Sequence, residues 1–173
     1  MFQCSINSLC QGISISVFVC FAASAIAGNL VNPQGTIILT VTGNIEHTNT
    51  PGKAEFDRSM LEGLGTEDLR TSTSWTDGQP LFSGVPLQRI MDAVGAHGSM
   101  LTAHALNDYI IDIPVSDFLK YPVLAALKMD GQYLTVRNKG PIWIVYPRDD
   151  FPELQNPFVD QKWIWQLYRL DVK

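Results

Sequence analysis

Aromatic residues that stand beside hydrogen-bonding groups are the residues of this sequence best suited to binding chemistry. Trp75 lies within the run Ser72 to Asp77, and Tyr109 directly follows Asn107 and Asp108. A flat heterocycle could stack on such a ring while the neighbouring polar groups form hydrogen bonds with its edge. These two positions are therefore the first candidates for a ligand site.

Three further tryptophans, Trp143, Trp163 and Trp165, lie at the ends of predicted strands or beside polar loops. Core packing is the more usual role of such a large apolar ring. We expect it for Trp143 and for one of the other two. Trp75 differs because its neighbours are almost wholly polar, which favours an exposed stacking role.

Nucleophilic and metal-dependent catalysis find little support in the sequence. There is no G-x-S-x-G elbow, and the three histidines, His47, His97 and His104, fall in different predicted elements. Neither H-x-x-x-H, nor C-x-x-C, nor an acidic loop of EF-hand spacing occurs. We therefore predict no catalytic residue and no metal site built by the protein.

Length and charge limit the class of protein. At 173 residues with 46% hydrophobic content, the chain has room for one domain with a sizeable core. The formal net charge of −5 argues against nucleic acid as a partner, because phosphate groups would be repelled.

The N-terminal segment has the pattern of a secretory signal peptide. Residues 13–27 are apolar and end in Ala25-Ile26-Ala27, an A-x-A arrangement. We predict residues 1–27 as the signal peptide and residues 28–173 as a single domain. Because residues 1–12 contain no Lys or Arg, a retained membrane anchor or a wrongly chosen start codon is the alternative.

All three cysteines, Cys4, Cys10 and Cys20, lie within this predicted leader. The processed chain would then have no disulfide, no thiolate ligand and no cysteine nucleophile. A secreted protein without cysteine fits the bacterial periplasm, which is the localisation that we predict.

The stretch Met129 to Pro147 is predicted to position a polar corner between two strands. Asp130-Gly131 is a tight-turn pair, and residues 133–136 and 142–146 are rich in β-forming side chains. The corner between them includes Asn138 and Lys139, which would be placed to contact a ligand. A basic surface turn without a ligand is the alternative.

The remaining pattern predicts many strands and a few short helices without strict alternation, which indicates an α+β fold with mixed β-sheets. We expect strands over residues 36–45, 100–106, 109–113, 123–128 and 163–172, while residues 81–85 lead into a helix. Helices are expected after an Asp57 N-cap, from Pro86 to Gly95 and from Pro114 to Leu119, and residues 148–160 are expected to form a loop.

Several of these segments resemble, in order and spacing, the oxidoreductase molybdopterin-binding domain, the fold of sulfite oxidase and its bacterial relatives. The resemblance rests on the segments 39–43 (LTVTG), 82–87 (FSGVPL), 107–109 (NDY), 113–114 (IP), 130–131 (DG), 140–141 (GP), 145–147 (VYP) and 163–172. It implies a sulfite oxidase-like α+β fold and a molybdopterin-type ligand.

Two residues of that family are missing at the matching positions. In the enzymes of the family a cysteine shortly before the Gly-Val-Pro-Leu segment ligates molybdenum, and here the corresponding run is Thr71 to Trp75. A hydroxyl is a much poorer molybdenum ligand than a thiolate. The family's closing strand often carries a lysine near the pterin phosphate, where this chain has Trp165. We therefore expect pterin binding without molybdenum.

The resemblance implies a periplasmic pterin-binding protein that reports ligand occupancy to a membrane sensor. A carboxylate such as Asp108 would suit the amino-pyrimidinone edge of the pterin. Two alternatives remain: a molybdopterin-dependent oxidoreductase subunit, and an interaction domain without a ligand. The expected ligand-binding residues are Ser72, Thr73, Trp75, Asn107, Asp108, Tyr109, Asn138, Lys139 and Trp165.

Overall fold

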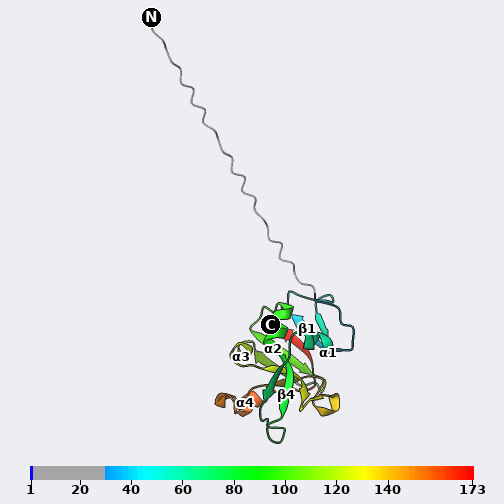
Figure 1. The fold of residues 1–173 in the computed structure, drawn as a ribbon, viewed down its shortest axis with the longest axis vertical. Coiled ribbons are helices and arrows are strands. Elements are labelled where there is room, and N and C mark those ends of the chain that lie inside the picture. Colours follow the sequence, from blue (N-terminus) through cyan, green and yellow to red (C-terminus); the bar gives the residue numbers. More distant parts are fainter. Residues whose placement is uncertain (2–29) are drawn as a thin grey trace.

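The computed structural model describes residue 1 and residues 30–173. The predicted signal peptide and its three cysteines lie outside the described residues. Two β-sheets and a few short helices make up the described part, so the predicted α+β fold with mixed sheets is confirmed (Figure 1). Within that part no helix is both long and apolar enough to cross a membrane.

The first sheet has five strands in the order β2-β1-β10-β5-β6. Strands β1 and β10 are parallel, and the other neighbours are antiparallel. The C-terminal strand, β10, is the middle strand of this order. The bounds are β1 (Ile37–Gly43), β2 (Ala54–Asp57), β5 (Met100–Ala105), β6 (Ile110–Pro114) and β10 (Leu167–Val172).

The second sheet is antiparallel, with the order β3-β4-β7-β8 and with β9 paired to β7. Gly84 permits the close approach of β4 to β7, because a Cβ there would lie 2.2 Å from the carbonyl oxygen of Ala125. The bounds are β3 (Glu67–Arg70), β4 (Leu81–Pro86), β7 (Leu124–Met129), β8 (Gln132–Tyr133) and β9 (Trp143–Val145).

The helices are short, and some of their ends coincide with signals in the sequence. The α-helices are α1 (Arg58–Gly63), α2 (Leu87–Val94), α3 (Ser116–Lys120) and α4 (Pro157–Asp160), and the 3-10 helices are η1 (Val136–Asn138) and η2 (Pro152–Leu154). The predicted cap at Asp57 and the predicted end of α2 at Gly95, which adopts a left-handed conformation, are confirmed. The apolar face of α2 is buried, as its helical spacing predicts.

Two predicted strands are shorter than expected. The strand expected over residues 133–136 ends at Tyr133, because the carbonyl of Thr135 accepts the amides of Asn138 and Gly140 and so turns the chain into η1. The closing strand begins at Leu167 rather than at residue 163. Just before it, Gln166 has a φ of 54° and donates its amide to the carbonyl of Lys139, so the chain leaves the extended conformation there.

Proline positions explain two further corrections. The sequence pattern places Pro114 at the start of a helix, but it is the last residue of β6, and α3 begins two residues later, at Ser116. The region 148–160 contains η2 and α4 and is therefore not the loop that its prolines predict. Pro152 and Pro157 stand in the first turns of these helices, where the missing N–H costs nothing.

Asp57 joins the first sheet to α1 and to the segment before β1. Its carboxylate accepts hydrogen bonds from the Ser59 hydroxyl at 2.6 Å and from the backbone amides of Met60, Gly35 and Gln34 at 2.9, 2.7 and 2.8 Å. These bonds, the one from Ser59 first, hold the pKa of Asp57 far below its ordinary value of 3.8. The ionised carboxylate is thus the form that stabilises the fold.

Asp57→Asn should therefore lower stability at neutral pH and flatten its dependence on acid. The folded-state pKa is depressed, so the contribution of Asp57 is present above pH 3.8 and disappears as the pH falls toward the folded value. Urea unfolding of both proteins between neutral pH and pH 3 checks this. Parallel pH profiles for the two proteins would show that Asp57 plays no such part.

Candidate functional site

A cleft of about 370 Å³ opens between the segment that carries Trp75, the β5–β6 hairpin and the chain from α4 to β10. Three of the four tryptophans of the chain line this cleft. Its lining consists of Trp75, Asn107, Tyr109, Pro157, Asp160, Gln161, Trp163, Ile164 and Trp165. The structure thus brings together residues from three segments that are far apart in the sequence.

The tryptophans form a connected group, the tryptophan wall, made of Trp75, Trp143, Trp163 and Trp165. The ring of Trp75 meets that of Trp165 edge-on, with centroids 5.3 Å apart, and lies 6.2 Å from that of Trp163. Trp143 and Trp163 are buried, as expected for Trp143 and one of the last two tryptophans. Trp75 keeps 37% of its surface exposed, so a ligand has access to its ring.

Asp149 holds the segment that carries Trp75. One carboxylate oxygen accepts the backbone amide of Ser72 at 2.6 Å and the side-chain amide of Gln79 at 2.8 Å, while the other accepts the Ser72 hydroxyl. Partial burial alone would raise the pKa of Asp149, but the bonds from Ser72 and Gln79 outweigh it and hold the pKa below its ordinary value. The carboxylate therefore anchors this segment in its ionised form.

The predicted site residues Ser72 and Thr73 do not line the cleft. The hydroxyl of Ser72 bonds to Asp149, and that of Thr73 bonds to the hydroxyl of Thr76 at 2.8 Å and accepts the amide of Trp75 at 2.9 Å. Both hydroxyls are thus engaged within the protein. In this structure they position Trp75 and do not face a ligand.

Asp149→Ala should loosen this segment without unfolding the protein. The substitution leaves the amide and hydroxyl of Ser72 without their acceptor, so amide exchange at Ser72 should accelerate by roughly tenfold. Hydrogen–deuterium exchange measures the effect, with Asp150→Ala, a change at the neighbouring exposed carboxylate, as the control. Equal protection of Ser72 in all three proteins would contradict this role of Asp149.

Two of the three predicted hairpin residues line the cleft. They are Asn107 and Tyr109, whereas Asp108 does not. Asp108 takes a φ of 65° in the turn between β5 and β6, a conformation that Asp tolerates. The hydroxyl of Tyr109 donates to the carbonyl of Gln161 at 3.0 Å, which joins the hairpin to the segment after α4.

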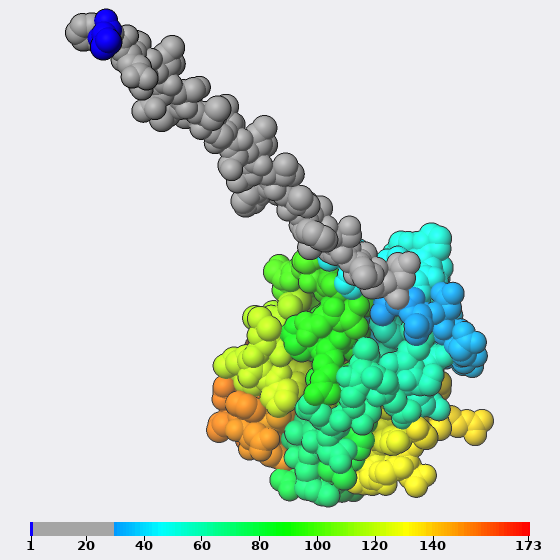
Figure 2. Space-filling view, turned by 45° about the horizontal axis from the view of Figure 1, so that its top comes forward, coloured from blue at the N-terminus to red at the C-terminus, as the bar shows by residue number. Residues whose placement is uncertain are grey.

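Sequence reasoning missed the side of the cleft built by α4. Asn156 caps this helix by accepting the amides of Phe158 and Val159, and Pro157 and Asp160 then line the cleft. In Figure 2 the orange segment with α4 lies against the green-blue segment that leads to Trp75. An Asn-Pro pair is a helix-start signal, so the helix itself was visible in the sequence.

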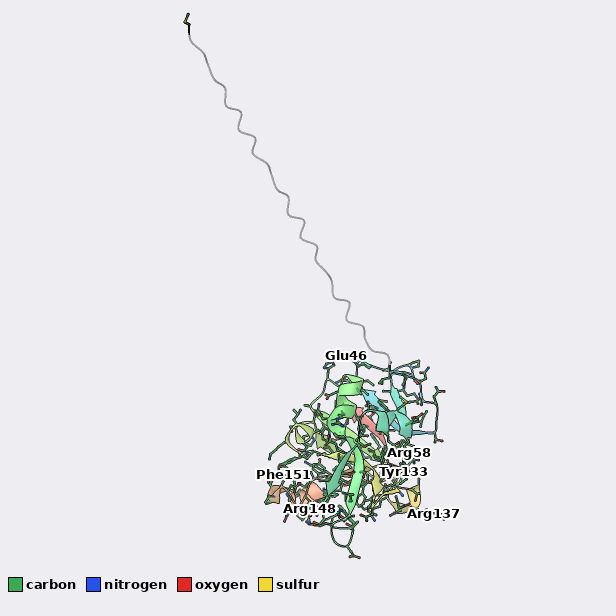
Figure 3. All side chains as sticks on the ribbon, in the orientation of Figure 1. Glu46, Arg58, Tyr133, Arg137, Arg148 and Phe151 are labelled. Atoms are coloured by element: carbon green, nitrogen blue, oxygen red, sulfur yellow. The ribbon has the colours of Figure 1, made fainter. Side chains whose placement is uncertain are left out.

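The predicted corner residues Asn138 and Lys139 do not line the cleft. The ammonium of Lys139 nevertheless lies 5.9 Å from the ring of Trp165 and 5.4 Å from that of Trp143, so it contacts the tryptophan wall. Arg137, from the same corner, and Arg148 lie on opposite sides of the view in Figure 3. Of the predicted set, Trp75, Asn107, Tyr109 and Trp165 are the residues that the cleft brings together.

The donor set of the cleft fits a pterin ring but not a thiolate-bound metal. The lining offers indole and phenol faces for stacking, amides from Asn107 and Gln161 and a carboxylate from Asp160. All cysteines of the sequence precede residue 21, and the described residues hold no group of three His, Cys, Asp or Glu side chains arranged to bind a metal. The residues that line the cleft therefore include no thiolate ligand.

Comparison with known proteins places the chain in a family. The family model described as "Oxidoreductase molybdopterin binding domain" matches residues 54–151, which is more than half of the chain. No curated protein matches the chain. The matched range contains Trp75, Asn107 and Tyr109, while the cleft residues of α4 and those up to Trp165 follow it. The chain belongs to the oxidoreductase molybdopterin binding domain family.

Proposed function

We propose that this protein binds a pterin in the cleft lined by Trp75, Trp163 and Trp165 and performs no molybdenum redox chemistry. The observation that carries the proposal is the cleft itself, in which Trp75 and Trp165 meet edge-on at 5.3 Å beside hydrogen-bonding side chains. A pterin is a flat bicyclic ring with donors and acceptors along one edge, which suits such a wall. Membership of a molybdopterin-binding family supports the same class of ligand.

The charge of the lining favours a pterin without a phosphate group. Among the residues that line the cleft there is no Lys, Arg or His, whereas Asp160 adds a carboxylate. Molybdopterin carries a phosphate, which proteins bind with cationic side chains or with exposed backbone amides. By the family resemblance, the position of the lysine that often serves this purpose corresponds here to Trp165. We therefore propose an unphosphorylated pterin as the ligand.

The proposed setting of this activity is the periplasm. The predicted signal peptide at residues 1–27 would export the protein, and the processed chain would carry no thiol. A binding protein of this kind would report ligand occupancy to the periplasmic part of a membrane sensor. This partner is proposed by analogy with the role of small exported binding modules.

Calorimetric titration of the purified protein with oxidised and tetrahydro pterins tests the proposal. We expect saturable binding of at least one unphosphorylated pterin, accompanied by a change in tryptophan fluorescence. A pterin phosphate should bind more weakly, because the lining offers it no Lys, Arg or His side chain while Asp160 adds a carboxylate. Absence of heat and of fluorescence change at high micromolar ligand would contradict pterin binding.

A further inference from the structure

Asp160 supplies the only carboxylate among the residues that line the cleft. It is the last residue of α4, and its side chain is 18% exposed. Asp108, which stands beside the lining residue Tyr109 in the sequence, lies outside the lining. A ligand in the cleft would thus meet the carboxylate of Asp160 and not that of Asp108.

The carboxylate of Asp160 is positioned from two sides but retains unused hydrogen-bonding capacity. One oxygen, Oδ2, accepts the hydroxyl of Ser74 at 2.8 Å. The other, Oδ1, lies 3.6 Å from Nε of Arg148, which is an ion-pair distance but too long for a hydrogen bond. Neither Oδ1 nor this Nε has a hydrogen-bond partner among the described residues. Both atoms are buried, so a ligand would reach the carboxylate through Oδ2, which can accept a second hydrogen bond beside that of Ser74.

Ser74 belongs to the segment that carries Trp75, whereas Arg148 lies outside the lining of the cleft. Ser74 directly precedes Trp75, so its bond to Asp160 places the carboxylate next to the stacking ring. Arg148 offsets part of the charge of Asp160 without occupying the carboxylate fully, because the two groups are 3.6 Å apart. A ring that stacks on Trp75 would therefore present its edge near Asp160.

We infer that Asp160 determines the specificity of the site by reading the amino-pyrimidinone edge of the pterin. This inference rests on the proposed function. A carboxylate oxygen accepts more than one hydrogen bond, so Oδ2 can accept the 2-amino group of the pterin beside the hydroxyl of Ser74. The edge is the same in oxidised and reduced pterins, so Asp160 selects the pterin class rather than an oxidation state. A ring with oxygen in place of the 2-amino group would face the carboxylate with an acceptor and would be rejected.

Pterin and lumazine provide the test, because lumazine carries a carbonyl oxygen where pterin carries the 2-amino group. The wild-type protein should bind pterin at least about tenfold more tightly than lumazine, since a hydrogen bond to a charged group is lost and an acceptor faces an acceptor. In Asp160→Asn the side chain offers one acceptor and one donor, which matches lumazine. The variant should therefore lose affinity for pterin and gain it for lumazine, so that the preference reverses.

Asp108→Asn is the matched control. It makes the same chemical change at a carboxylate outside the lining, and asparagine tolerates the φ of 65° at that position. Its pterin-to-lumazine ratio should equal that of the wild type. Circular dichroism and thermal unfolding verify that both variants fold.

The outcomes separate the inference from the function on which it rests. If the wild-type protein binds neither pterin nor lumazine, the proposed function fails. If it binds both equally, or if Asp160→Asn keeps the wild-type preference for pterin, the pterin cleft stands and the role of Asp160 is overturned. Even if Asp160→Asn does not fold, the ratio of the pterin and lumazine affinities of the wild-type protein still tests the role of Asp160.

Discussion

Trp75→Ala should weaken pterin binding by roughly 10- to 100-fold, the loss expected when an aromatic stacking partner of a nucleobase-like ring is removed. The stability of the protein should fall less than after removal of a fully buried tryptophan, because Trp75 is 37% exposed. Calorimetry is the suitable measurement, because removal of Trp75 also alters the fluorescence signal.

Tyr168→Ala is the control for this experiment. Tyr168 lies in β10, is exposed to a similar degree at 38%, and is not part of the cleft lining. Its removal should leave pterin affinity unchanged. Equal affinities of the wild type and Trp75→Ala would show that the ligand does not stack on this ring, even if it binds elsewhere in the protein.

Trp143→Ala should destabilise the protein by about 3–5 kcal/mol, the usual cost of removing a large aromatic side chain from a core. Trp143 is fully buried in β9, and its ring meets that of Phe82 edge-on with centroids 5.2 Å apart. It also lies 6.4 Å from Trp163 and 6.3 Å from Trp165. The substitution would thus remove the support of the tryptophan wall as well as core volume.

Urea unfolding measures this effect, with Phe158→Ala as the control. Phe158 is an aromatic residue of α4 that is 81% exposed, so its removal should hardly change the free energy of unfolding. A loss of less than about 1 kcal/mol in Trp143→Ala would be at odds with a well-packed tryptophan wall.

Local signals in the sequence predicted much of the fold. Some signals act over only a few residues, so the sequence alone specifies the structure that they form. These are the cap at Asp57, the glycine at position 95 and the hairpin around Asn107 and Asp108. The spacing of apolar residues in α2 likewise predicted its buried face. The pattern of strands and short helices predicted the fold class, the family resemblance implied the same one, and the family match over residues 54–151 supports it.

The remaining features depend on contacts between distant segments. The bond between Ser74 and Asp160 spans 86 positions, and that between Ser72 and Asp149 spans 77. No local pattern indicates that the hydroxyl of Ser72 is engaged by Asp149. In the same way, the early end of the strand at Tyr133 follows from the two amides that Thr135 accepts, which short-range propensity does not predict.

The residues that line the cleft lie partly inside and partly outside the range that the family model matches. The residues matched by the family model provide Trp75 and the hairpin residues, while α4 and Trp165 come from the following segment. This second part contributes the carboxylate of Asp160 and one of the stacking rings. Ligand specificity would thus arise largely outside the matched range.

Analysis of the protein isolated from its native source tests the central claim most directly. After denaturation, the released small molecules are identified by mass spectrometry and molybdenum is measured on the same sample. The account predicts an unphosphorylated pterin in an amount approaching that of the protein, with molybdenum far below it. Molybdenum at near-stoichiometric amount together with a phosphorylated molybdopterin would contradict it.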